Sequence, residues 1–235
     1  MKILIDPEGN THLLEEGKDF HSKHGTIKTQ DITNGTLTTN KGTTYHCFEA
    51  DFIDKLAHIF RGPATMHQKD IGYLLSHLPI TKETVIVDAG TGCGILAAFL
   101  ARTSNHVTSY DQRKEHLIIA GKNFTLLGVN VTTKNNNIYE GIEEQEVDII
   151  TLDLLEPWRV LPHAATALKQ GGYLAAYVTN TNQLQHFIIE AKQQGFLIER
   201  AVETNERLWD VDEQKTRPQH VGLQHTGFLI IARKP

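Results

Sequence analysis

Glycines alternate with other residues in the segment DAGTGCGI, residues 88–95, directly after the β-prone run TVIV. Glycine tolerates positive φ, so Gly90 suits a tight turn, and Gly92 would let a ligand approach the backbone. Gly94 would let a following helix pack closely. The glycines alone would fit a plain strand-to-helix turn about equally well. Their spacing, Gly-x-Gly-x-Gly, differs from the Gly-x-Gly-x-x-Gly of dinucleotide sites.

Two carboxylates accompany these glycines. Asp88 lies inside the segment, and Asp111 lies 23 residues later, at the end of the next predicted strand. In nucleotide-binding folds an acid about 20 residues beyond the glycines binds the ribose hydroxyls. This spacing favours a ribose-containing ligand over a merely solvated acid at Asp111.

A third carboxylate ends the apolar run VDIITL at Asp153, and Glu156, Pro157 and Trp158 follow it. A strand that delivers an acid to its own end is a candidate for chemistry. The same residues would also fit a helix start, because acids and proline are both favoured in the first helical turn.

Strands and helices alternate regularly around these residues. This pattern predicts a mainly parallel sheet covered on both faces. The last two strands have no helix between them, so we expect them to pair antiparallel. The predicted strands are 84–90, 106–111, 130–134, 146–153, 171–178, 196–211 and 225–234, and the helices are 95–103, 113–128, 157–168 and 182–195.

The first part of the chain has a different pattern. Residues 1–50 consist of short β-prone runs separated by turn signals, including a hairpin around residues 40–42. Short helices are predicted at 51–60 and 69–78. We therefore expect a small all-β domain over residues 1–60 and a larger α/β domain over residues 61–235.

Composition narrows the possible settings and partners. The chain has 235 residues, of which 40% are hydrophobic, enough for a sizeable core. It contains no apolar run of membrane-spanning length, and its start does not resemble a signal peptide. Cys47 and Cys93 offer no disulfide framework, so a reduced, cytoplasmic setting is expected. The net charge of −5 argues mildly against a nucleic-acid partner unless basic residues cluster.

The acid followed by Gly-x-Gly-x-Gly resembles the first motif of class I S-adenosylmethionine (AdoMet)-dependent methyltransferases. The resemblance implies a Rossmann-like α/β fold, with a seven-stranded, mainly parallel sheet and an antiparallel closing strand. It also implies AdoMet as the cofactor, with Asp111 on the ribose and Asn137, in a register uncertain by one residue, on the adenine amine. His116 lies either near that ribose or exposed on its helix. The implied contacts from the loop are Asp88, Gly90, Gly92, Cys93, Gly94 and Ile95.

Four further segments together resemble a narrower family, the T-loop tRNA adenine-N1 methyltransferases in their archaeal form. These segments are GPATMHQKDIGYLL, VDAGTGCGILAAFLA, DLLEPW and RPQHVGLQHTGFLIIARK, in that order. The resemblance implies that Asp153, beside the cofactor, points at the target adenine and that His67 lies over it. The family usually has Gln and Pro where this chain has Ala64 and Gln68. It further implies a tRNA substrate, methylated at position 58 with position 57 as a second candidate, and a homotetramer without membrane attachment.

Two other functions fit parts of this pattern. One is an AdoMet methyltransferase of the same fold that acts on a protein carboxyl or a small molecule, because fold does not fix substrate. The other is a noncatalytic tRNA-binding subunit, which we would expect to have lost the glycine loop. Trp158 could pack in the core or stack on a base. RNA binding would require basic residues to converge; the candidates are Lys2, Lys18, Lys23, Lys28, Lys41, Arg61 and Arg217.

Overall fold

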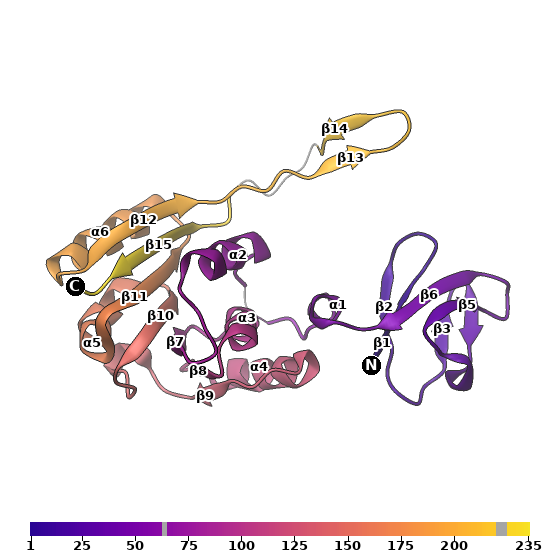
Figure 1. Ribbon diagram of the computed structural model, residues 1–235, viewed down its shortest axis with the longest axis horizontal. Helices are drawn as coiled ribbons and strands as arrows, with labels where there is room; N and C mark the ends of the chain where they lie inside the picture. The colour runs from indigo at the N-terminus through magenta and orange to yellow at the C-terminus, as the bar shows by residue number, and fades with distance from the viewer. Residues whose placement is uncertain (63–64, 220–224) are drawn as a thin grey trace. The chain divides into compact units, whose positions relative to one another are not determined.

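The computed structural model describes residues 1–62, 65–219 and 225–235. Ala64, one of the two positions at which the chain differs from the family it resembles, therefore lies outside the described residues, as does part of the segment RPQHVGLQHTG. The chain forms two compact units, one of residues 1–60 with 126–128 and one of residues 61–125 with 129–235. Figure 1 shows the elements of both. Among the described helices, none combines the length and apolar character that a bilayer crossing requires.

The N-terminal unit is built on a four-stranded antiparallel sheet. Its strand order is β2 (Thr11–Leu13), β1 (Lys2–Ile5), β6 (Thr44–Glu49) and β5 (Gly35–Thr38). The expected hairpin between β5 and β6 is present. A second hairpin joins β3 (Phe20–Ser22) to β4 (Gly25–Ile27), and a short 3-10 turn (Thr29–Asp31) follows it. The core contains the fully buried Leu4, Tyr45 and Cys47.

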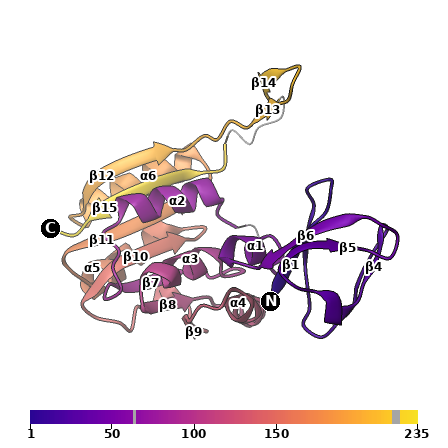
Figure 2. The same ribbon diagram turned by 45° about the vertical axis from the view of Figure 1, so that its right-hand side comes forward.

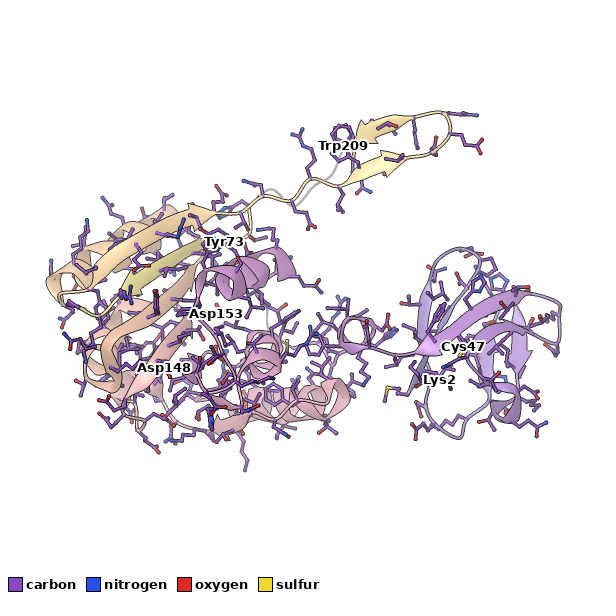
Figure 3. The ribbon with its side chains drawn as sticks, viewed as in Figure 1. Lys2, Cys47, Tyr73, Asp148, Asp153 and Trp209 are labelled. Atoms are coloured by element: carbon purple, nitrogen blue, oxygen red, sulfur yellow. The ribbon has the colours of Figure 1, made fainter. Side chains whose placement is uncertain are left out.

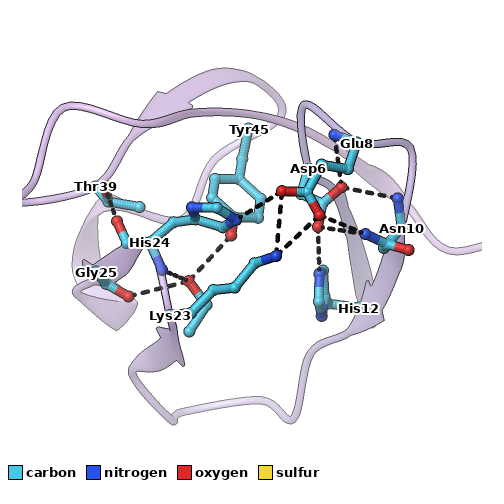
Figure 4. Close-up of polar contacts among 10 residues, drawn as sticks. Asp6, Glu8, Asn10, His12, Lys23, His24, Gly25, Thr39 and Tyr45 are labelled. Carbon is cyan, nitrogen blue, oxygen red and sulfur yellow. Dashed lines mark hydrogen bonds and ion pairs between the residues drawn. The ribbon is translucent and has the colours of Figure 1, made fainter.

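Side-chain contacts hold the turns of this unit. Asp6 Oδ1 accepts hydrogen bonds from the backbone N–H groups of Glu8 at 2.9 Å and Asn10 at 2.8 Å, as Figure 4 shows. Hydrogen bonds, first that from the Asn10 side chain, lower the pKa of Asp6 to about 2. Four of the candidate RNA-binding lysines form ion pairs within the unit: Lys2 with Glu49, Lys18 with Glu15, Lys23 with Glu8 and Lys28 with Asp19. These lysines therefore do not form an uncompensated basic surface.

The larger unit contains a seven-stranded sheet, and the expected fold class is confirmed. Only β15 runs antiparallel, pairing with β11 on one side and β12 on the other. The β15–β12 pairing is the predicted antiparallel closing pair. The strand order is β12 (Leu197–Glu203), β15 (Phe228–Arg233), β11 (Leu168–Val178), β10 (Val147–Asp153), β7 (Val85–Ala89), β8 (His106–Tyr110) and β9 (Thr132–Lys134).

Helices cover both faces of this sheet. One face packs on α2 (Gln68–His77) and α3 (Ile95–Thr103), through buried residues such as Leu74 and Leu100. Figure 2 shows these two helices lying across the sheet. The other face packs on α5 (Leu161–Ala167) and α6 (Thr181–Gln193), through residues such as Leu161 and Phe187. Helix α4 (Lys114–Leu127) packs on α3, where the Phe124 ring lies beside Gly94.

Two predicted helices are shorter or divided. The helix expected at 51–60 is confined to α1 (Phe52–Leu56), which begins with a capping box between Asp51 and Asp54. The helix expected at 157–168 divides into a 3-10 turn, η3 (Pro157–Val160), and α5, each with a proline in its first turn. Proline lacks a backbone N–H and is suited to helix starts, so two prolines favour two starts.

The strand predicted over 196–211 is wrong as one continuous strand. β12 ends at Glu203, and the chain continues into a separate two-stranded sheet of β13 (Trp209–Val211) and β14 (Thr216–Pro218). The break occurs where Lys69 Nζ donates to both the carbonyl oxygen and the hydroxyl of Thr204, each at 2.9 Å. The partner strand β15 begins at Phe228, opposite Glu203, so β12 has no further residue of β15 to pair with beyond this point.

A buried ion pair connects α2 to the closing strands. Lys69 Nζ lies 2.8 Å from Asp70 Oδ1, and the Asp70 side chain is fully buried. Thr226, just before β15, donates to Asp70 Oδ2 at 2.7 Å, and the Thr204 hydroxyl donates to Oδ1. The pair thus joins three segments that lie far apart in the sequence.

We predict that Asp70→Ala lowers the free energy of unfolding by about 3–5 kcal/mol, because it leaves the Lys69 ammonium buried without its carboxylate. Urea denaturation followed by circular dichroism measures this loss. The double variant Lys69→Met/Asp70→Leu removes both charges and should recover most of it. A single variant within about 1 kcal/mol of the wild type would contradict the structural importance of the pair.

Candidate functional site

A cavity of about 510 Å³ opens at the carboxyl ends of β7, β8 and β10. This is the edge at which open α/β folds bind their ligands. Five of the residues predicted from the sequence line it: Gly90, Gly92, Asp111, Asn137 and Asp153. The volume suits a ligand of nucleoside size, because small-molecule sites commonly measure about 300–1,000 Å³.

Close backbone packing makes glycine necessary in the loop after β7. Gly90 has a φ of +92°, and a Cβ there would lie 2.0 Å from the carbonyl oxygen of Asp153. Gly94 has a φ of +87°, and its Cβ would lie 2.6 Å from the Phe124 ring. The first glycine allows the loop to meet the end of β10, and the second allows α3 to meet α4. Cys93 is buried in the loop, and Ile95 begins α3; neither lines the cavity.

Three donors hold the Asp111 carboxylate at the end of β8. Its Oδ2 accepts from Gly92 N at 3.1 Å and from His116 Nδ1 at 2.9 Å. Its Oδ1 accepts from Arg113 N at 2.9 Å. The carboxylate is therefore fixed at the cavity wall before any ligand binds, as a ribose-binding group requires.

His116 lies behind Asp111. Its side chain is buried on α4, and the residue is not part of the cavity lining. The alternative of an exposed helix histidine is wrong. Contact with the ribose stays a prediction, while the structure gives His116 a direct role in orienting Asp111.

Asp88 lies beneath the loop. It is 1% exposed, and its two carboxylate oxygens accept from the hydroxyls of Ser109 at 2.6 Å and Thr151 at 2.7 Å. Burial raises the pKa of Asp88, opposed by these two hydrogen bonds, and the nearby Asp111 raises it further. Asp88 thus ties the start of the glycine loop to β8 and β10 through these hydrogen bonds, and its direct contact with a ligand stays a prediction.

Asp153 ends β10 at the cavity and is labelled in Figure 3. Burial, and secondarily the negative charge of Asp88, raise its pKa to about 7. No cation is among the causes that set this pKa or that of Asp88. The cavity therefore contains a carboxylate whose negative charge a cationic ligand would stabilise.

The sequence did not identify Tyr177, which is the register partner of Asp153 on the neighbouring strand β11. Its hydroxyl donates to Thr226 O at 2.6 Å, and the absence of a Cβ at Gly227 makes room for its ring. Burial, with the charges of Asp70 and Asp153, raises its pKa to about 12. Aligning the ends of the two adjacent parallel strands would have placed Tyr177 beside Asp153.

Another pair of residues lines the far side of the cavity. The Arg159 guanidinium lies over the Tyr139 ring, 4.4 Å from its centroid. Asn137 is close to them, but its side-chain oxygen accepts from Tyr139 N at 3.2 Å and its amide donates to Glu140 at 3.0 Å. Asn136 lines the cavity beside Asn137, so both neighbouring asparagines lie where the sequence predicts the adenine contact.

The remaining predicted residues lie outside the cavity lining. His67 is exposed and immediately precedes α2, with no side-chain capping bond. Trp158 is partly buried, packs against the core and stacks on His186 of α6 with 4.3 Å between ring centroids. The structure thus gives Trp158 a packing role.

These observations fit a nucleoside carrying a positive charge. Asp111 is preorganised for ribose hydroxyls, the glycines admit the ligand to the backbone, and Asp153 lies close to where a cationic group would bind. The cavity therefore has the size and the polar lining that the predicted AdoMet site requires, and contact of Asp153 with a second molecule stays a prediction.

Comparison with known proteins agrees with this geometry. The model of the family described as tRNA methyltransferase complex GCD14 subunit matches residues 61–228. The chain is 30% identical to the tRNA (adenine(57)-N(1)/adenine(58)-N(1))-methyltransferase TrmI of Methanocaldococcus jannaschii, covering 100% of this chain and 95% of that protein. It is also 30% identical to the tRNA (adenine(58)-N(1))-methyltransferase TrmI of Thermus thermophilus, covering 99% and 96%. A crystal structure described as a SAM-dependent O-methyltransferase from Thermotoga maritima matches with a TM-score of 0.88 and 26% identity, covering 99% and 92%.

We predict that Gly90→Ala weakens AdoMet binding at least about tenfold, or about 1.4 kcal/mol, because the added Cβ must displace the end of β10. Titration calorimetry measures the affinity, and circular dichroism confirms folding. Gly72→Ala is the matched control: this glycine lies inside α2 with nothing near its Cβ position, so the variant should bind normally. Helix propensity should make it more stable by about 0.5–1 kcal/mol. Wild-type affinity in Gly90→Ala would show that the loop and β10 need not pack closely for binding.

Proposed function

The chain belongs to the tRNA methyltransferase family of the GCD14 subunit, and on that premise we propose that it transfers a methyl group from AdoMet to N1 of an adenosine in the T-loop of tRNA, at position 58. The observation that carries this proposal is the Asp153 carboxylate. It ends β10 beside a nucleoside-sized cavity, in a full-length relative of two tRNA adenine-N1 methyltransferases.

The chemistry needs little proton transfer. AdoMet supplies a methyl group activated by its positively charged sulfur. Adenine N1 already has a free lone pair, so no general base is needed to create the nucleophile. The N1–carbon bond forms as the sulfur–carbon bond breaks, and the positive charge passes to the adenine ring.

Asp153 serves this reaction as a hydrogen-bond acceptor. A carboxylate that accepts a hydrogen bond from the N6 amine fixes the orientation of the ring and stabilises the charge that develops on it. Because burial raises its pKa to about 7, the carboxyl is only partly ionised near neutrality until positive charge enters the cavity. Tyr177 lies beside Asp153, and we assign it to the wall of the acceptor site.

The target atom lies on the Watson–Crick edge of adenine, which is turned inward in folded tRNA. The base must therefore leave its loop and enter the cavity, as in other enzymes that modify bases. Arg113 and Arg159 line the cavity with side chains more than half exposed, at 57% and 53%. Each also pairs with an acid of the cavity, Arg113 with Asp111 and Arg159 with Glu156. We assign both to the RNA phosphates, with which arginine commonly forms hydrogen bonds.

Two other activities are separable by experiment. The Thermotoga maritima protein is described as an O-methyltransferase, which keeps a small-molecule or protein carboxyl acceptor as the second candidate. Incubation with labelled AdoMet and either unmodified tRNA or a cell extract free of nucleic acid distinguishes the acceptors. A noncatalytic tRNA-binding subunit would bind tRNA without AdoMet, so calorimetric AdoMet binding argues against it.

We predict that Asp153→Ala and Asp153→Asn lower the rate of N1-methyladenosine formation at least about 100-fold, or about 2.7 kcal/mol. AdoMet affinity should fall by a much smaller factor, because the cofactor loses only the attraction of one carboxylate. The wild-type kcat/KM for AdoMet should rise with pH through about 7, because this ratio reports the ionisation of Asp153 before the cofactor binds, and the residual rate of Asp153→Asn should lack this rise. Nucleoside analysis of labelled tRNA measures both effects, and primer extension through the T-loop shows whether position 57 is also methylated, because a methyl group on N1 stops the reverse transcriptase. Unchanged turnover in either variant would remove Asp153 from the mechanism.

We further propose that the protein is a cytoplasmic homotetramer. Support comes from the small β13–β14 sheet, because an isolated two-stranded hairpin is marginally stable alone. This region exposes Leu208, Trp209 and Val211 by 52%, 53% and 71%. Exposed apolar groups of this kind mark protein contacts.

Light scattering should give a mass about four times the 26.4 kDa of one chain. The double variant Trp209→Ser/Val211→Ser should give smaller species. Ile118→Ser, which changes an equally exposed residue on α4, should not alter the mass. A monomeric wild-type protein would contradict the proposal.

A further inference from the structure

An apolar side chain stands at the rim of the cavity. Leu155 lies two residues beyond Asp153, lines the cavity and is 77% exposed. The nearby Leu152 and Leu154 pack into the hydrophobic core on the sheet face that α5 and α6 cover. Packing within this chain therefore accounts for Leu152 and Leu154 but not for Leu155.

The backbone at Leu155 is held from two sides. Its carbonyl oxygen accepts from Gln183 Nε2 at 2.8 Å, and the next residue, Glu156, donates its N–H to the Tyr139 hydroxyl at 3.2 Å. The Gln183 side chain is in turn fixed, because its Oε1 accepts from Asn180 Nδ2 at 2.9 Å. Gln183 from α6 and Tyr139 from η2 (Ile138–Glu140) thus hold the loop while the leucine side chain points to solvent.

This arrangement suits contact with a nucleobase. A base presents a flat face on which aromatic side chains stack with little dependence on sequence, and an aliphatic side chain can cover part of the same face. Proteins that unstack nucleic acids often insert an aliphatic side chain into the vacated position. A rigidly held leucine next to the acceptor carboxylate has the position and the chemistry for this task.

We propose that Leu155 packs against the T-loop base next to the target adenosine and fills the stacking position that the target leaves. This inference rests on the proposed function and adds a residue that stabilises the opened loop. Asp153 acts on the extracted base, whereas Leu155 acts on the RNA that remains outside the cavity.

The test compares Leu155→Ala, the conservative Leu155→Met and the control Ile118→Ala, which shortens an exposed apolar residue on α4. Each is assayed for kcat/KM with folded unmodified tRNA, for kcat/KM with a single-stranded oligonucleotide of the T-loop sequence, and for AdoMet Kd by calorimetry. Leu155→Ala should lose about tenfold in kcat/KM with folded tRNA, a typical effect of removing one stacking contact. It should lose less than about threefold with the oligonucleotide, which needs no opening. Leu155→Met should keep most activity, and AdoMet Kd should not change.

Three results would overturn the inference. The first is activity of Leu155→Ala on folded tRNA equal to that of Ile118→Ala. The second is equal loss on both RNA substrates, which would make Leu155 a contact of the target base itself. The third is a proportional loss of AdoMet affinity, which would make it a wall of the cofactor cavity. A wild-type protein that methylates neither RNA would instead reject the proposed function, and the inference with it.

Discussion

The contact between Gly90 and the carbonyl oxygen of Asp153 sets the geometry of the site. β7 and β10 are parallel neighbours, so their carboxyl ends meet at one edge of the sheet. There the loop after β7 passes so close to the end of β10 that any Cβ at Gly90 would overlap it. The same loop presents Gly92 N to Asp111, and this hydrogen bond brings the end of β8 into the arrangement. One backbone approach thus positions carboxylates from two different strands around a single cavity.

The electrostatics of the cavity differ from those of the rest of the molecule. Two acids outside the cavity have a cation beside them: Asp70 has Lys69 and Glu8 has Lys23. Asp153 has instead the negative charge of Asp88, and both acids have raised pKa values. A cationic ligand would supply the missing charge and lower the pKa of Asp153, because opposite charges favour ionisation. Under the proposed function, cofactor binding and ionisation of Asp153 are therefore linked, and each promotes the other.

The sequence predicted features that depend on local pattern. Strand–helix alternation, the glycine loop and the acid at the end of β8 all leave signals within short windows, and the seven-stranded sheet follows from them. Features that depend on distant contacts were missed. Thr204, where the expected long strand breaks, is separated by 135 residues from its partner Lys69. The position of Tyr177 beside Asp153 depends on the register between β10 and β11. The sequence predicted that His116 lies in a helix, but the burial of its side of that helix depends on tertiary packing.

The segment from Asp153 to Trp158 acts as a rigid bridge between the sheet and α6. Its first residue belongs to β10, and its last stacks on His186 of α6. Between them, Gln183 and Tyr139 hold the backbone at Leu155 and Glu156. Groups that are held before binding lose little conformational entropy when substrate arrives. Trp158 therefore contributes to the site through packing. By anchoring the end of this segment on α6, it helps to keep the Asp153 carboxylate and the Leu155 side chain at a fixed separation.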